Sequence, residues 1–73
     1  MAEQIDHPAH YGGADDPYEA IKVIDAWGLN FSLGSALKYI SRHGKKPGAE
    51  APVDLRKAAW YLLHEADRLD SKA

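Results

Sequence analysis

The sequence predicts an all-α fold, a small three-helix domain over residues 1–73 with an irregular N-terminal arm. Two observations favour it: apolar residues recur with a helical period in three segments, and Gly and Pro separate those segments. A third is that no segment shows the alternation with period two that is typical of strands. We therefore expect the arm at residues 1–14 and helices at residues 17–27, 33–43 and 52–69.

The first fourteen residues show no regular period, and Pro8, Gly12 and Gly13 interrupt them. A disordered tail needs only polar and small residues. This arm also carries His7, His10 and Tyr11, which suggests that it has a role in the folded protein. We expect the arm to fold over a ligand pocket. The alternative is that it only packs against a helix.

The first helix has a clear start signal. Asp16 is the expected N-cap, Pro17 takes the first helical position, and Glu19 follows the cap by three residues, as in a capping box. Gly28 is the expected left-handed terminator. The apolar residues that share a face are Tyr18, Ile21, Ile24 and Trp27.

The second helix is expected to begin after Ser32 as N-cap and to stop at Gly44. Its buried stripe consists of Leu33, Ala36, Leu37 and Ile40. The third helix opens at Pro52 and has the most regular pattern, with apolar steps of 4, 3, 4 and 3. This seam is typical of a coiled coil and consists of Leu55, Ala59, Leu62, Ala66 and Leu69.

Size and charge together favour a homo-oligomer. A chain of 73 residues buries only about 60% of its unfolded surface, and small proteins usually need a further source of stability. The chain has no cysteine, so disulfides cannot supply it. Residues 1–30 hold six acids against one base, a balance of −5, whereas residues 38–57 hold six bases against two acids, a balance of +4. Opposite charges of this kind can join subunits or attract an anion.

The basic middle of the chain carries candidate phosphate ligands. Lys38 and Arg42 are four residues apart on one helix face, so their head groups can converge on one anion. Arg offers a planar fork for phosphate oxygens, and Lys offers a point charge. The aromatic rings of Tyr39, Trp60 and Tyr61 can stack on a nucleobase. The alternative is a solvated basic surface beside core or subunit-contact aromatics.

Other chemistries find less support. His7 and His10 do not have the spacing of a known zinc motif, so we expect no metal site. The sequence contains no phosphate-binding Gly-rich loop of the P-loop type and no nucleophile elbow. We assign no catalytic residue and no cofactor, and whether the protein is an enzyme stays open.

Four motifs resemble a family of small bacteriophage proteins, mostly of unknown function, whose domain also occurs in the nucleotide kinase of T7-like phages. They are His-Pro-x-His-Tyr at 7–11, Tyr-Glu-x-Ile at 18–21, Gly-x-x-x-Lys-Tyr-Ile-x-Arg-x-Gly-x-Lys at 34–46, and Asp-Leu-Arg-Lys-Ala-x-Trp-Tyr-Leu at 54–62. The resemblance covers residues 5–63 and implies a mostly helical fold, self-association and a nucleotide-like ligand. Where many relatives have Asn, this chain has Ser35. The motif positions implied as ligand-binding are His7, His10, Tyr11, Lys38, Tyr39, Arg42, Lys46, Asp54, Lys57 and Trp60, to which the stacking argument adds Tyr61.

Three functions stay open. The first is an oligomer that captures a nucleotide or cyclic nucleotide, as a sponge for a host immune signal does. The second is a kinase of deoxynucleoside monophosphates, and the third is a structural assembly protein without a ligand. No apolar run approaches the about 20 residues of a membrane span, and a nucleic-acid partner is not favoured. We expect the host cytoplasm as the location.

Overall fold

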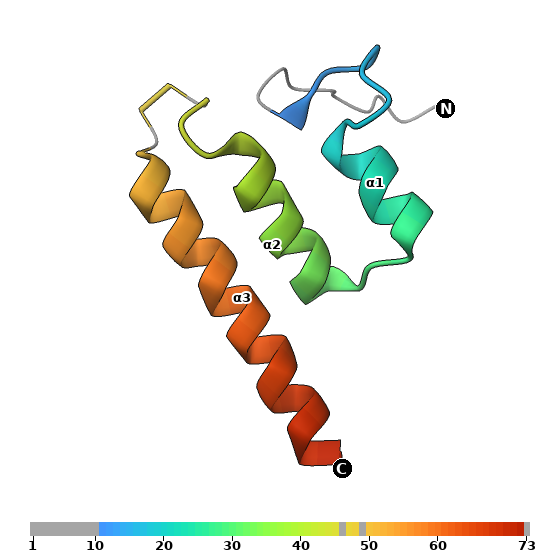
Figure 1. Cartoon of the computed structure of the whole chain (residues 1–73), viewed down its shortest axis with the longest axis vertical. Coiled ribbons are helices and arrows are strands. Elements are labelled where there is room, and N and C mark those ends of the chain that lie inside the picture. Colours follow the sequence, from blue (N-terminus) through green and yellow to red (C-terminus); the bar gives the residue numbers. More distant parts are fainter. Residues whose placement is uncertain (1–10, 46, 49, 73) are drawn as a thin grey trace, which may run out of the picture.

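The computed structural model describes residues 11–45, 47–48 and 50–72. It has three helices, α1 (Ala20–Trp27), α2 (Phe31–Arg42) and α3 (Ala51–Lys72). No strand occurs among the described residues, so the all-helical prediction is confirmed. In Figure 1, α2 lies between α1 and α3, and α2 and α3 form an antiparallel hairpin. No helix in the described part is long and apolar enough to cross a membrane.

The segment before α1 forms a turn of its own, and the helix begins at Ala20, three residues after the expected start. Asp16 does accept a local hydrogen bond, because its Oδ1 takes the N–H of Tyr18 at 2.8 Å. Its carbonyl also accepts the N–H of Glu19 at 3.1 Å, which closes the turn. Glu19 is then extended, with ψ of 139°, and separates the turn from α1. The other end matches the prediction, since Gly28 is left-handed, with φ of 64° and ψ of 38°.

Asn30 begins α2 and also ties it to α3. Its Oδ1 accepts the N–H of Leu33 at 3.0 Å, so Asn30 rather than Ser32 is the N-cap. Its Nδ2 donates to Oε2 of Glu65 on α3 at 2.9 Å. One amide therefore fixes both the start of α2 and the position of α3 beside it.

Gly34 of α2 lies against α1, with room for a methyl group. A Cβ atom at this position would lie 3.4 Å from Cγ2 of Ile24 on α1, at the near edge of ordinary contact.

The interior of the described part is small. The buried apolar residues are Ala20, Ala36 and Ala58, and four polar or charged residues are buried with them. Most of the large apolar side chains remain accessible, including the leucines of the predicted seam on α3. These leucines are not part of the buried interior. The buried residues of α2 and α3 are instead small or charged, namely Gly34, Ala36, Arg42, Asp54, Ala58 and Glu65.

Candidate functional site

The end of α2 and the start of α3 are joined by a buried ion pair. Arg42 donates from Nε and Nη2 to Oδ1 of Asp54 at 3.2 and 3.0 Å. Both residues are buried, and Asp54 is only 1% exposed. The connection between the helices is short, so the last turn of α2 and the first turn of α3 face each other.

Arg42 also joins two aromatic side chains to this pair. Its Nη1 donates to the hydroxyl of Tyr11 at 3.2 Å, and its guanidinium lies 4.6 Å from the ring centroid of Tyr39. Burial alone lowers the pKa of Arg42, but the hydrogen bonds with Asp54 and Tyr11 outweigh it, so the pKa lies above its ordinary value. The guanidinium therefore stays charged and holds Tyr11 and Tyr39 in place.

An aromatic hollow of about 180 Å³ opens beside Arg42 on this face of the hairpin. Tyr39 of α2 and Tyr61 of α3 stack, with ring centroids 6.0 Å apart and planes 17° apart. Phe31 meets Tyr61 edge-on at 6.0 Å. The residues that line this aromatic hollow are Tyr11, Phe31, Ser35, Lys38, Tyr39 and Tyr61.

A second, wider depression lies at the connection between α2 and α3. This loop-side hollow has a volume of about 710 Å³. Its lining residues are Arg42, Pro47, Gly48, Glu50, Val53, Asp54 and Lys57. Oδ2 of Asp54 is buried and has no hydrogen-bond partner among the described residues.

Two exposed lysines stand at the two hollows. The ammonium of Lys57 lies 5.4 Å from the centroid of Tyr39, and that of Lys38 lies 5.5 Å from the centroid of Tyr11. Both side chains are exposed, so they can meet an anion from solvent. Asp54 balances the charge of Arg42, so among the described residues that line the two hollows these lysines are the cations without a carboxylate partner in the structure.

The structure gathers most of the site residues predicted from the sequence. Trp60 lines neither hollow; it meets Tyr61 edge-on at 5.1 Å and stacks on His64 at 5.2 Å. His7, His10 and Lys46 lie outside the described residues. The predicted residues that come together are Tyr11, Lys38, Tyr39, Arg42, Asp54, Lys57 and Tyr61.

Sequence reasoning missed Phe31 as a wall of the aromatic hollow. With Ser32 taken as the N-cap, Phe31 fell outside the helix. The available signal was Asn30, an equally good capping residue, which places Phe31 in the first turn on the side of Ser35 and Tyr39. Within the described ranges, no three His, Asp or Glu side chains gather as a metal site would require.

A family model described as a protein of unknown function (DUF3310) matches residues 5–63. The matched range contains every site residue predicted from the sequence. No curated protein matches the chain, and no solved structure does.

Proposed function

The chain belongs to the DUF3310 family, and because that family has no assigned function, we propose one from the site: it binds a phosphorylated nucleotide. The observation that carries this proposal is that Lys57 lies over the ring of Tyr39 and Lys38 over that of Tyr11, beside the stacked rings of Tyr39 and Tyr61. A nucleotide presents a flat aromatic base and an anionic phosphate, and this surface offers a partner for each.

The base is assigned to the aromatic hollow. Tyr39, Tyr61 and Phe31 supply ring surface there, and stacking on such rings is worth about 1–3 kcal/mol per base. The hydroxyl of Ser35 also lines this hollow, where it can donate to or accept from a polar edge of the base.

The phosphate is assigned to Lys57, with Lys38 as the second cation. Its spacing from Lys38 suggested that Arg42 binds phosphate, but we assign it a structural role in the site. Its guanidinium already donates to Asp54 and Tyr11, so its main contribution is to hold Tyr11 and Tyr39 at the walls of the site.

Calorimetric titration of the full chain tests the proposal, with the four deoxynucleoside 5′-monophosphates, the matching deoxynucleosides and inorganic phosphate as probes. At least one monophosphate should bind more tightly than its nucleoside and more tightly than phosphate alone. Equal affinity for nucleotide and nucleoside, or no heat with any probe, would contradict the proposal.

A matched pair of variants locates the phosphate. Lys57→Met removes a cation at the loop-side hollow, whereas Lys45→Met removes the same charge from a residue that lines neither hollow. Binding of the monophosphate should weaken about tenfold or more for Lys57→Met, which corresponds to one charge-assisted hydrogen bond. Lys45→Met should leave it nearly unchanged.

The resemblance to phage proteins suggests the biological setting. We place the chain in the host cytoplasm as a phage protein that sequesters a nucleotide signal, and we propose that it acts as a homo-oligomer. The small alanine interior and the accessible leucines support self-association. Incubation with a monophosphate and ATP, followed by denaturation and chromatography, separates sequestration from turnover: the nucleotide should be recovered unchanged, and new diphosphate would make the protein a kinase.

A further inference from the structure

One face of α3 carries a row of accessible leucines. Leu55, Leu62 and Leu69 are 44%, 46% and 54% exposed, and the exposed alanines Ala59 and Ala66 lie between them. At 100° per residue, this row is turned about a third of the helix circumference from Tyr61, which lines the aromatic hollow. The leucine row and the site therefore lie on different faces of the hairpin.

The last turns of α3 extend beyond α2. Asn30, just before α2, bonds to Glu65, and α3 continues to Lys72, seven residues further. Figure 1 shows this C-terminal part of α3 running past the start of α2. An isolated helical end of this kind is marginal in water, and it carries the exposed Leu69.

We propose that a second copy of this chain covers the leucine row. The two α3 helices are antiparallel, Leu62 of each helix packs against Ala66 of the other, and the two copies of Leu63 meet beside this layer. The projecting end of each α3 then lies along the first half of the other α3. This deepens the self-association part of the proposed function and is independent of nucleotide binding.

The order of large and small residues favours the antiparallel direction. In this register Ala66 faces Leu62 of the partner subunit, and Ala59 faces Leu69 of the partner subunit, so each large side chain meets a small one. A parallel pair would place alanine against alanine and leucine against leucine. The alanine layers would then lack the side-chain volume that close packing needs.

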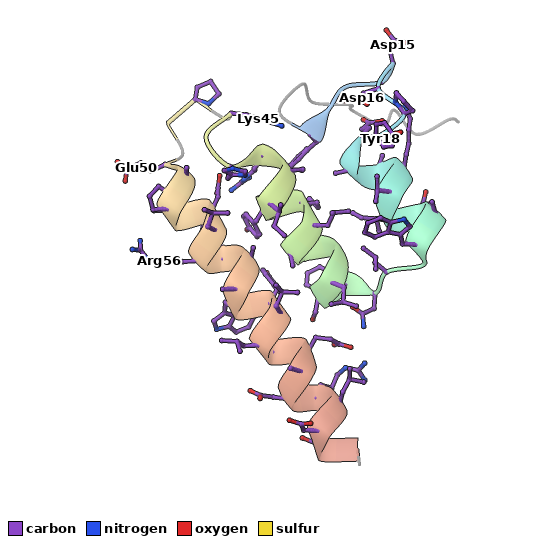
Figure 2. The ribbon with its side chains drawn as sticks, viewed as in Figure 1. Asp15, Asp16, Tyr18, Lys45, Glu50 and Arg56 are labelled. Atoms are coloured by element: carbon purple, nitrogen blue, oxygen red, sulfur yellow. The ribbon has the colours of Figure 1, made fainter. Side chains whose placement is uncertain are left out.

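The charges beside the row agree with the same register. Arg56 and Asp70 are exposed, and each follows a leucine of the row by one position, as Leu63 does. The side chain of Arg56 points away from α2 in Figure 2. Among these flanking positions, where Leu63 meets its own copy, Arg56 faces Asp70 of the partner subunit, and symmetry forms this pair twice.

Thiol cross-linking tests the direction of the pair, because the chain has no cysteine of its own. Leu63→Cys should give a covalent dimer with a short thiol-specific cross-linker, since residue 63 meets its own copy. Ala59→Cys should give none, because the two copies of residue 59 lie about 15 Å apart along the helix axis. Cross-linking of Ala59→Cys without Leu63→Cys would overturn the antiparallel arrangement.

Charge reversal tests the register. Arg56→Asp and Asp70→Arg should each raise the dissociation constant about tenfold at low salt, and the double variant should restore it. Sedimentation measures the constant, and circular dichroism checks that each variant is helical. Unchanged constants for both single variants would overturn this register while leaving self-association intact. A wild-type chain that is monomeric at micromolar concentration would overturn self-association itself, and the nucleotide titration is a separate measurement.

Discussion

The guanidinium of Arg42 donates two hydrogen bonds to a single oxygen of Asp54 in the space between α2 and α3. Both side chains are buried, and the nearby apolar interior consists of alanines rather than larger residues. The ion pair is therefore a principal contact between the two helices, besides being part of the candidate site.

Removal of Arg42 alone should unfold much of the protein. Arg42→Met leaves the carboxylate of Asp54 buried without its partner, which costs about 3–5 kcal/mol. That loss approaches the whole stability of a domain of this size. Urea unfolding followed by circular dichroism at 222 nm measures it.

The double variant Arg42→Met/Asp54→Leu is the control for this prediction. It replaces both charges by apolar side chains, so we expect it to be more stable than Arg42→Met. A double variant as unstable as the single one would show that packing of the arginine, rather than the uncompensated charge, governs the loss.

Replacement by alanine should change the free energy of unfolding in opposite directions at Gly34 and Gly12. A Cβ atom at Gly34 meets Ile24 at 3.4 Å or more, and alanine is the better helix former, so Gly34→Ala should stabilise by about 0.5–1 kcal/mol. At Gly12 the backbone φ is 117°, and a Cβ atom would lie 2.9 Å from Cα of Glu19. Gly12→Ala should therefore destabilise by about 1–3 kcal/mol. Thermal unfolding of the two variants, recorded at one protein concentration, checks the signs.

Glu65 should make the stability of the protein fall at acidic pH. Hydrogen bonds from Arg68 and then Asn30 lower the pKa of Glu65 from 4.5 to about 2. Because the folded state lowers this pKa, the stabilisation is fully present above pH 4.5 and is lost as the pH falls towards 2. Urea unfolding at several pH values should show a steeper loss over this range for wild type than for Glu65→Gln.

A second variant tests the cause of that shift. Arg68→Met removes the strongest of the two donors to Glu65 and should also flatten the decline between pH 4.5 and 2. If Glu65→Gln and wild type lose stability in parallel, the lowered pKa of Glu65 is wrong.

Tyr61 should matter for nucleotide binding more than a tyrosine that lies away from the hollows. Tyr61→Leu removes a stacking surface of the aromatic hollow and should weaken binding of the preferred monophosphate by about 1–3 kcal/mol. Tyr18→Leu is the matched control, because Tyr18 is 79% exposed and lies before α1, away from α3 (Figure 2). Calorimetry that finds the same loss for both variants would remove Tyr61 from the site.

The sequence predicts the three helices because their apolar spacing is a local signal, as is the glycine that follows each of the first two helices. It misplaces the start of α2 because Asn30 gains a bond to Glu65, a contact across 35 residues of chain that no local pattern contains. It misplaces the start of α1 for a similar reason: the extended, buried Glu19 lies against Gly12, and this contact ends the turn that Asp16 begins.

In the candidate site, too, the sequence predicts what depends on local spacing and misses what depends on contacts between distant residues. The spacing of Lys38 and Arg42 correctly predicts that they share a face, and both reach Tyr11. The spacing does not reveal that Asp54 neutralises Arg42, because that pairing depends on the register between α2 and α3. Opposite charges on either side of a short interhelical connection were the signal for it.

Neighbouring positions of α3 lie on surfaces with different proposed roles. Lys57 and Tyr61 line the hollows, whereas Arg56 and Leu62, one residue away from each, lie on the surface that we assign to the second copy. If both proposals hold, substitutions at adjacent positions of α3 would change ligand binding and assembly independently. Saturation mutagenesis of α3 would test this. Positions where substitution weakens ligand binding and positions where it weakens assembly should each recur with the period of a helix, on two different faces.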